Sequence, residues 1–341
     1  MDNEKIEKAL IGVTVLIVLS VVWRIFGLNV DDMINVGIMT MLCIGFTFTY
    51  MMDGFPNLAH TSYAIVGAVT SFFLVRFYGF NPYDSWPFSV FVGGALGVFL
   101  YIILVRRIRQ REGNQSIILT FTFLAVATVL GSLSYIFSYW VSVVNYPTSQ
   151  YNLSRLDFRL YGSPGIVLVG IGTCILVTLY LYYFLTKTKT GVSLRAIAVD
   201  EDLSEVLGIN SFRVHCLAWF ISGGLAALAG SIIVIHRGMS PQGADDLLVL
   251  VMTGAIFGGL DSIFGAIIGG VFVAVSQKVL ATLLFWIFGQ KVLMWAPIYP
   301  IIFLVVTLVY FPNGVLSSGS TGSKWLTRLR ERIDRLLANQ S

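Results

Sequence analysis

The fold class of this chain is decided by apolar runs such as residues 214–235, VHCLAWFISGGLAALAGSIIVI. This run contains no Asp, Glu, Lys or Arg, and about 20 mostly apolar residues are enough for a helix to cross a bilayer. The whole chain has the same character, since 56% of its residues are hydrophobic and 12% are charged, against roughly 25% charged in soluble domains. We therefore predict an all-α fold, a polytopic bundle of helices in a membrane.

Ten runs of this kind are candidate spans, and the eighth is too short to cross a bilayer alone. The first run follows MDNEKIEK, which holds three acids and two lysines, and no small-residue cleavage pattern comes after it. We therefore interpret this run as a retained span and not as a signal peptide. The candidate spans are residues 9–28, 33–52, 61–78, 88–105, 117–143, 166–185, 214–235, 247–257, 263–285 and 292–310.

The positions of Lys and Arg predict which side each loop faces, because cytoplasmic loops carry an excess of basic residues. With both termini in the cytoplasm, the ten spans place 15 of the 22 basic residues inside. The net charge of +4 follows from this topology and does not indicate nucleic-acid binding. We expect a multi-pass protein of the cell (inner) membrane. The inside residues are Lys5, Lys8, Arg106, Arg107, Arg109, Arg111, Lys187, Lys189, Arg195, Arg213, Lys324, Arg328, Arg330, Arg332 and Arg335.

No long linker or low-complexity stretch divides the chain, so we predict one transmembrane domain over residues 1–316. A basic amphipathic tail, residues 317–341, follows it on the cytoplasmic side. We expect this tail to lie along anionic lipid headgroups or to cover part of a soluble partner. The longest loop on the outer side, residues 144–165, suits the docking of a soluble partner, or it is a surface lid without one.

The longest polar interruption is residues 186–211, TKTKTGVSLRAIAVDEDLSEVLGINS. Within it, Asp202 and Glu205 have the D-x-x-E spacing of a capping box, which predicts a short helix that Gly208 ends. Leu203, Val206 and Leu207 would share one apolar face of that helix. Such a face on the basic side could bind a soluble partner, or the segment could be a helical connection packed against its own neighbours.

Polar residues near the membrane interior are the candidates for a translocation pathway. The Gly/Pro break after the second span leads into Asn57, His60, Thr61 and Ser62. These side chains could line a water-filled cavity, or the break could be a tight turn between spans. Thr120 and Thr122 mark a polar stripe in the fifth span, although Ser and Thr in membrane helices usually bond their own backbone.

Glycines cluster within or beside several spans. Gly265 and Gly269 have the small-xxx-small spacing that lets two membrane helices approach closely, and Gly259 lies just before them. We predict that these three residues are helix-packing positions. Gly93, Gly94, Gly97, Gly223, Gly224 and Gly230 form further clusters of the same kind.

Signatures of known enzymes are missing, including H-E-x-x-H, G-x-S-x-G and the Walker motif of ATPases. We expect no catalytic residue, no metal and no cofactor, so uphill transport would need an ion gradient or a separate motor. The histidines and cysteines lie on separate segments and lack the spacing of metal ligands. These residues are His60, His215, His236, Cys43, Cys174 and Cys216.

Several stretches, in order along the chain, resemble the branched-chain amino-acid permeases of ABC importers. Residues 57–60 (NLAH), 188–200 (TKTGVSLRAIAVD), 207–210 (LGIN) and 218–230 (AWFISGGLAALAG) are similar to the early and central parts of that family. Residues 258–270 (GGLDSIFGAIIGG) are similar to its late glycine signature, with Asp261 where a third glycine is usual. The ending FPNGV at 311–315 resembles the family's closing R-P-x-G-L.

The resemblance implies a permease subunit without an ATPase site of its own. It would form the translocation pathway with a second permease, as a heterodimer, while two cytoplasmic ABC ATPases would bind ATP and an external binding protein would supply branched-chain or related amino acids. The segment from Asp200 to Ile209 would be the coupling helix that enters a groove on the ATPase. Relatives that import sugars or urea and amides leave the substrate open. An ion-coupled secondary transporter is the alternative from another class, which the acids at span ends, Asp53 and Asp261, disfavour.

Overall fold

The computed structural model describes residues 29–110, 115–144, 150–160, 163–290, 298–310 and 314. Within these ranges almost all regular structure is helical, and two short antiparallel strands pair at one end of the molecule. In chain order the elements are α2 (Val30–Asp53), α3 (His60–Tyr78), α4 (Trp86–Leu100), the π-helix η1 (Tyr101–Val105), α5 (Arg106–Arg109), α6 (Gln115–Val143), the 3₁₀ turn η2 (Ser154–Leu156), β1 (Arg159–Leu160), β2 (Ser163–Pro164), α7 (Gly165–Lys187), α8 (Lys189–Val199), α9 (Glu201–Val206), α10 (Ser211–His236), α11 (Gly243–Gly258), α12 (Ile263–Phe288) and α13 (Ile298–Tyr310).

Among the described residues, seven helices are long and apolar enough to cross a membrane, which confirms a polytopic helical membrane protein. They are α2, α3, the continuous helix α4–η1–α5, α6, α7, α10 and α12. The predicted short eighth run is α11, of 16 residues, and α13 has 13 residues. The first predicted span, residues 9–28, and the tail, residues 317–341, lie outside the described residues.

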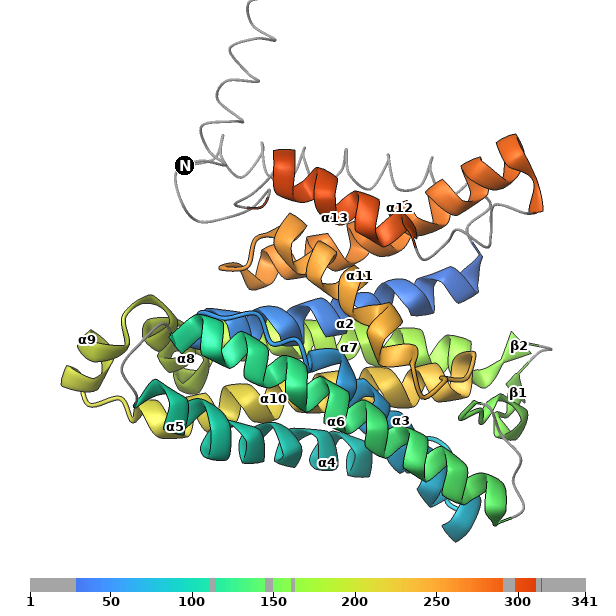
Figure 1. Ribbon diagram of the computed structural model, residues 1–341, viewed down its shortest axis with the longest axis horizontal. Helices are drawn as coiled ribbons and strands as arrows, with labels where there is room; N and C mark the ends of the chain where they lie inside the picture. Colours follow the sequence, from blue (N-terminus) through green and yellow to red (C-terminus); the bar gives the residue numbers. More distant parts are fainter. Residues whose placement is uncertain are drawn as a thin grey trace, which may run out of the picture.

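Helix α10 lies at the centre of the bundle. In its most apolar stretch, 89% of the residues are buried, whereas the corresponding shares are 11% for α6 and 6% for α12. It packs against α2, α3 and α4, and Figure 1 shows it running between the end that carries α8 and α9 and the end that carries the strands. The sequence accounts for this position, since residues 222–231 of α10 are rich in Gly, Ala and Ser, which let helix backbones approach closely.

The approach of α10 to its neighbours is so close that side chains would not fit. A Cβ added at Gly67 of α3 would lie 2.0 Å from the carbonyl oxygen of Ala227, and one at Gly230 of α10 would lie 1.8 Å from that of Ala64. A Cβ added at Gly93 of α4 would lie 2.6 Å from the carbonyl oxygen of Gly223. The predicted glycine clusters therefore form the contacts of α10 with α3 and α4.

A second close contact joins α11 to α12. Gly265 meets Gly258, and Gly269 meets Gly254, at distances that leave no room for a Cβ. The prediction of Gly265 and Gly269 as packing residues is confirmed. The packing role of Gly259 stays a prediction; Gly259 has φ +108° and forms the turn that ends α11. Its conformation, which L side chains rarely adopt, explains the glycine.

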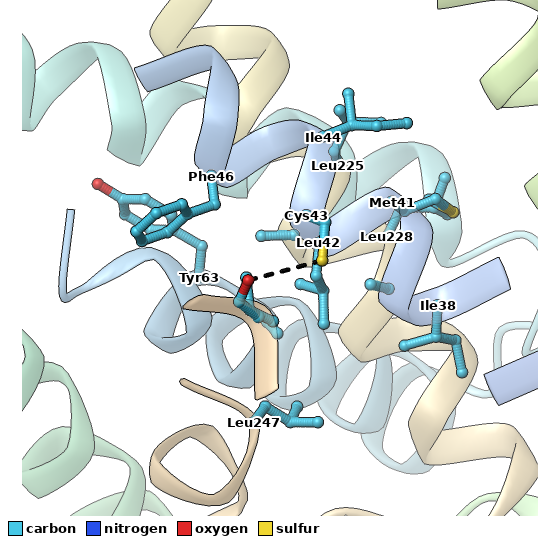
Figure 2. Close-up of a cluster of buried hydrophobic side chains, with 14 of the residues drawn as sticks. Ile38, Met41, Leu42, Cys43, Ile44, Phe46, Tyr63, Leu225, Leu228 and Leu247 are labelled. Atoms are coloured by element: carbon cyan, nitrogen blue, oxygen red, sulfur yellow. Dashed lines mark hydrogen bonds between the residues drawn. The ribbon is translucent and has the colours of Figure 1, made fainter. Parts of the chain in front are cut away.

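The apolar core where α2 meets α10 and α11 is drawn in Figure 2. Ile38, Met41 and Leu42 of α2 are fully or almost fully buried there, together with Leu228 of α10. The Cys43 thiol donates to the carbonyl oxygen of Val251 on α11, with 3.6 Å between sulfur and oxygen (Figure 2). All three cysteines, Cys43, Cys174 and Cys216, are free thiols.

Gly230→Ala should reduce the stability of the fold, because the new methyl group would push α3 away from α10. We expect a loss of about 2 kcal/mol, the usual cost of overpacking a core. Thermal unfolding in detergent, followed by fluorescence-detected size exclusion, measures the effect. The matched control is Gly131→Ala in α6, where an added Cβ has no neighbour within 4 Å and should preserve or slightly raise the midpoint. Equal midpoints for the two variants would contradict the close-packing account.

Candidate coupling site

The polar segment between α7 and α10 folds into two short helices. In α8, the Thr188 side chain caps the first turn by accepting from the Gly191 amide at 3.1 Å. Asp200 then adopts an extended conformation, which ends α8, and its side chain accepts from the Leu203 amide at 2.9 Å. Asp200 is therefore the N-cap of α9.

The predicted capping box of Asp202 and Glu205 is wrong, because α9 begins at Glu201, one residue before Asp202. The sequence offers Asp200 and Asp202 as caps at nearly the same place, and the end of α8 at Val199 selects Asp200. The predicted stop at Gly208 is confirmed, since Gly208 has φ +85° and the chain leaves the helix there. A hydrogen bond donated by the Ile209 amide to the carbonyl oxygen of Ser204, 3.0 Å long, closes this end.

The apolar face of α9 points away from the rest of the chain. Leu203 is 56% exposed, Val206 84% and Leu207 73%, and α9 lies at the tip of the molecule in Figure 1. Asp202 and Glu205 are exposed on the same short element. Contiguous exposed apolar side chains of this kind mark protein interaction surfaces, which favours the partner-binding reading of the segment over packing against its own neighbours.

Behind this exposed face, α9 is fixed to the bundle by four charged side chains, which we call the charge cluster: Asp53, Arg109, Glu201 and His215. They come from the end of α2, from α5, from the first position of α9 and from the first turns of α10. Arg109 lies 3.1 Å from a Glu201 oxygen and 3.4 Å from Asp53 Oδ1. Glu201 thus connects α9 to α5 and α10, and Arg109 and His215 in turn connect it to Asp53 of α2.

His215 lies between the two acids of the charge cluster. Its Nδ1 is 3.4 Å from Asp53 Oδ1 and its Nε2 is 3.1 Å from Glu201 Oε1. An imidazolium can donate from both ring nitrogens, so this arrangement suits the protonated ring. Tyr101 stacks on the imidazole with the two ring planes 4° apart, which fixes the orientation of the ring.

Asp53 is the buried anchor of the charge cluster, with a side chain that is 0% exposed. The Trp219 indole donates to its Oδ2 at 2.7 Å, while Arg109 and His215 approach Oδ1. A buried carboxylate without such partners would cost several kcal/mol, and removing one partner of a buried pair typically costs 3–5 kcal/mol. The end of α2 is therefore held to α10.

Glu201 is less buried than Asp53, and its surroundings lower its pKa. Burial alone would raise the pKa, but the hydrogen bond from the Ser211 hydroxyl and the charges of Arg109 and His215 outweigh that effect. Because the pKa of Glu201 is lowered in the folded state, the ionised carboxylate stabilises the fold at a pH above 4.5, the ordinary pKa of a glutamate. This contribution is lost only as the pH falls through the lowered pKa.

The predicted translocation residues lie in two separate places. Asn57, His60, Thr61 and Ser62 are buried in the packed start of α3, where the Asn57 side chain accepts from the Ala59 amide at 3.1 Å. His60 Nδ1 lies 3.3 Å from the Ser222 hydroxyl of α10. Within this chain, these contacts are those of a capped turn between spans.

Thr120 and Thr122 lie on α6, and their hydroxyls donate to backbone carbonyls. The acceptors are the carbonyl oxygens of Ser116 and Ile118, one turn earlier, each at 2.8 Å. These are the self-contained bonds typical of membrane helices.

Comparison with known proteins identifies the family of the chain. Residues 30–311 match the profile of the branched-chain amino acid transport system / permease component family. The chain belongs to this family. It is 31% identical to the probable branched-chain amino acid transport permease protein LivH of Methanocaldococcus jannaschii, over 88% of this chain and 92% of the relative.

Two bacterial relatives match over most of their length. The chain is 25% identical to the high-affinity branched-chain amino acid transport system permease protein BraD of Pseudomonas aeruginosa, over 81% of this chain and 90% of the relative. It is also 25% identical to the corresponding permease protein LivH of Salmonella typhimurium, with the same coverage of both chains. The family resemblance expected from the sequence is confirmed.

The sequence reasoning did not identify the charge cluster of this permease. It placed Asp53 at the end of a span and His215 on a segment of its own. It counted Arg109 only among the cytoplasmic basic residues and included Glu201 only as part of the coupling segment. The four residues are separated by up to 162 positions (215 − 53), so only the packing of α2, α5 and α10 brings them together. The available signal was that Asp53, Arg109 and His215 lie at or near the ends of predicted spans on the basic side, and that Glu201 lies in the polar segment on the same side.

Glu201→Gln should weaken the link between α9 and the permease core, because it removes the charge that faces Arg109 and His215. In an assembled importer we expect uptake per ATP hydrolysed to fall by roughly fivefold or more, as for a coupling free energy of 1–3 kcal/mol. Asp202→Asn is the matched control, since it removes a carboxylate from the next residue, which is exposed. A Glu201→Gln importer as tightly coupled as the Asp202→Asn importer would contradict the role of the charge cluster.

Proposed function

We propose that this permease forms the translocation pathway of an ABC importer for branched-chain or related amino acids. Its family and the names of its relatives support this substrate class. The proposed assembly contains a second, unlike permease, two cytoplasmic ATPases that bind ATP, and an external binding protein that delivers substrate. The chain itself supplies no catalytic residue, metal or cofactor to the transport cycle.

The proposed topology has about ten spans, and both termini lie in the cytoplasm. The importer would lie in the cell (inner) membrane. The distribution of Lys and Arg supports this topology. This orientation puts α8, α9 and the charge cluster on the cytoplasmic side, and the β1–β2 hairpin outside. In the same proposal, the tail of residues 317–341 lies along the cytoplasmic headgroups.

The single observation that carries the mechanism is that α9 exposes an apolar face and is anchored by a partly buried charge cluster. In our proposal the ATPase binds Leu203, Val206 and Leu207, and ATP-driven closure of the two ATPases displaces α9. Glu201 transmits this displacement to Arg109 and His215, and so to the ends of α5 and α10. Because α10 packs against α2, α3 and α4, its tilt would move the core of the permease.

The substrate pathway in this proposal lies between the two permeases, as it must if neither chain encloses it. We assign Thr120 and Thr122 to its wall, since α6 is 11% buried within this chain and is free to face a second subunit. Asn57, His60, Thr61 and Ser62 would act from behind that wall, because they fix the start of α3 against α10.

Val206→Asp should detach the ATPase while the permease still folds, because Val206 is 84% exposed and has little packing to lose. A charge in a desolvated groove without a partner costs several kcal/mol, so co-purification in mild detergent should fall by at least about a hundredfold. Leu203→Asp should behave in the same way. Leu156→Asp, an exposed position near the β1–β2 hairpin at the other end of the molecule, is the control and should retain the ATPase. Normal co-purification of the ATPase with both α9 variants would contradict the proposed coupling site.

A further inference from the structure

A cavity of about 710 Å³ opens at the end of the bundle opposite α9. It lies between the first turns of α2, the connection from α10 to α11, the start of α11 and the middle of α12. Its size falls in the usual range for small-molecule sites, roughly 300–1,000 Å³. None of the predicted pathway residues lines it, and the coupling mechanism does not use it.

The charges in this cavity have both signs. Asp32 of α2 and the first-turn residues Asp245 and Asp246 of α11 supply carboxylates, and Arg237 and Lys278 supply cations. Lys278 is the only Lys, Arg, Asp or Glu in α12, a helix of otherwise apolar and small polar residues. A charge at such a position is costly in a membrane helix and is usually retained for function.

The ion pair of Lys278 with Asp32 is accessible to a ligand. Its Nζ lies 3.1 Å from Asp32 Oδ1, and the Lys278 side chain is 38% exposed. Both residues of the pair line the cavity, so a small charged ligand in the cavity can reach them. Arg237 lines the same cavity and forms no ion pair with another residue in the described ranges.

Much of the remaining wall of the cavity is apolar, although Asn35, Gln150, Ser240 and Gln277 add uncharged polar groups. Val36 and Met39 of α2, Leu247 and Leu250 of α11, and Val275 of α12 line it. An acidic group, a basic group and an apolar surface within one cavity match the three parts of an amino acid with an aliphatic side chain. The ammonium group would face the aspartates, the carboxylate would face Lys278 and Arg237, and the side chain would contact the apolar wall.

We propose that this cavity is a binding site of the permease for a zwitterionic α-amino acid with an aliphatic side chain. The inference rests on the proposed function for its choice of substrate, and it adds that the permease itself recognises the two charged groups. The site would take up substrate after release from the external binding protein. Affinity would be low, because the aspartates and cations partly neutralise one another before the ligand arrives.

The test uses the complete importer in lipid nanodiscs with Ala281→Cys, a cavity-lining position one helical turn from Lys278. Leucine at ten times its dissociation constant should slow alkylation of this cysteine by a water-soluble maleimide about tenfold. Leucinamide, which lacks the carboxylate, and 4-methylpentanoate, which lacks the ammonium group, should each bind at least about tenfold more weakly. Tyr78→Cys, exposed at the end of α3 and outside the cavity, is the control, and leucine should leave its alkylation unchanged.

Charge removal identifies the groups that hold the ligand. Lys278→Met in the Ala281→Cys background should abolish protection by leucine, but it also breaks the pair with Asp32. Arg237→Gln removes a cation without breaking an ion pair among the described residues, and it too should weaken protection by about tenfold. Size-exclusion profiles confirm that each variant is assembled.

The proposal is overturned if leucine gives no protection up to its solubility limit, or if the two analogues protect as well as leucine. Protection that survives both charge removals would also overturn it. Uptake of leucine by the reconstituted wild-type importer tests the proposed function separately. Leucine uptake without protection of the cysteine would contradict this binding site alone. Absence of leucine uptake would contradict the proposed function. In that case the alkylation result still decides whether the cavity binds leucine.

Discussion

The backbone contact of α10 with α3 and α4 is the constraint on which the rest of the structure depends. Lipid tails are as apolar as leucine, so membrane helices gain little from hydrophobic burial and must associate through close packing. Gly67, Gly93 and Gly230 allow that packing because they carry no Cβ where a neighbouring carbonyl lies. The core of the permease is thus a rigid unit organised around one helix.

Helix α10 also determines how the two ends of the permease are related. Its first turns carry His215 and hold α9 through the charge cluster, and its last residues lead into the connection that lines the cavity. The close glycine contacts limit how far its middle can deform. A displacement of α9 is therefore expected to tilt α10 as a whole and to alter the opposite end, which is the behaviour a gate requires.

The charge cluster and the apolar tip of α9 have different physical tasks. Exposed apolar side chains can bind and release a partner during each cycle, because their burial is favourable and non-directional. The charge cluster is directional and partly buried, so it holds Glu201 in one geometry relative to α2, α5 and α10. Because its exposed apolar face can bind a partner and Glu201 is held by the charge cluster, α9 is suited to transmitting movement.

The membrane class, most spans, the packing role of Gly265 and Gly269, and the end of α9 at Gly208 could all be predicted from the sequence. Each depends on composition, on helical spacing or on the backbone preference of one residue, and such properties act within a few turns of the chain. The cap at Asp200 instead of Asp202 was missed because the end of α8 decided between two equivalent aspartates. The charge cluster and the mixed charges of the cavity depend on tertiary structure, since residues such as Asp53 and His215, or Asp32 and Lys278, meet only when their helices pack. A single sequence specifies which side chains are available, but helix crossing decides which of them come within a few ångströms of one another.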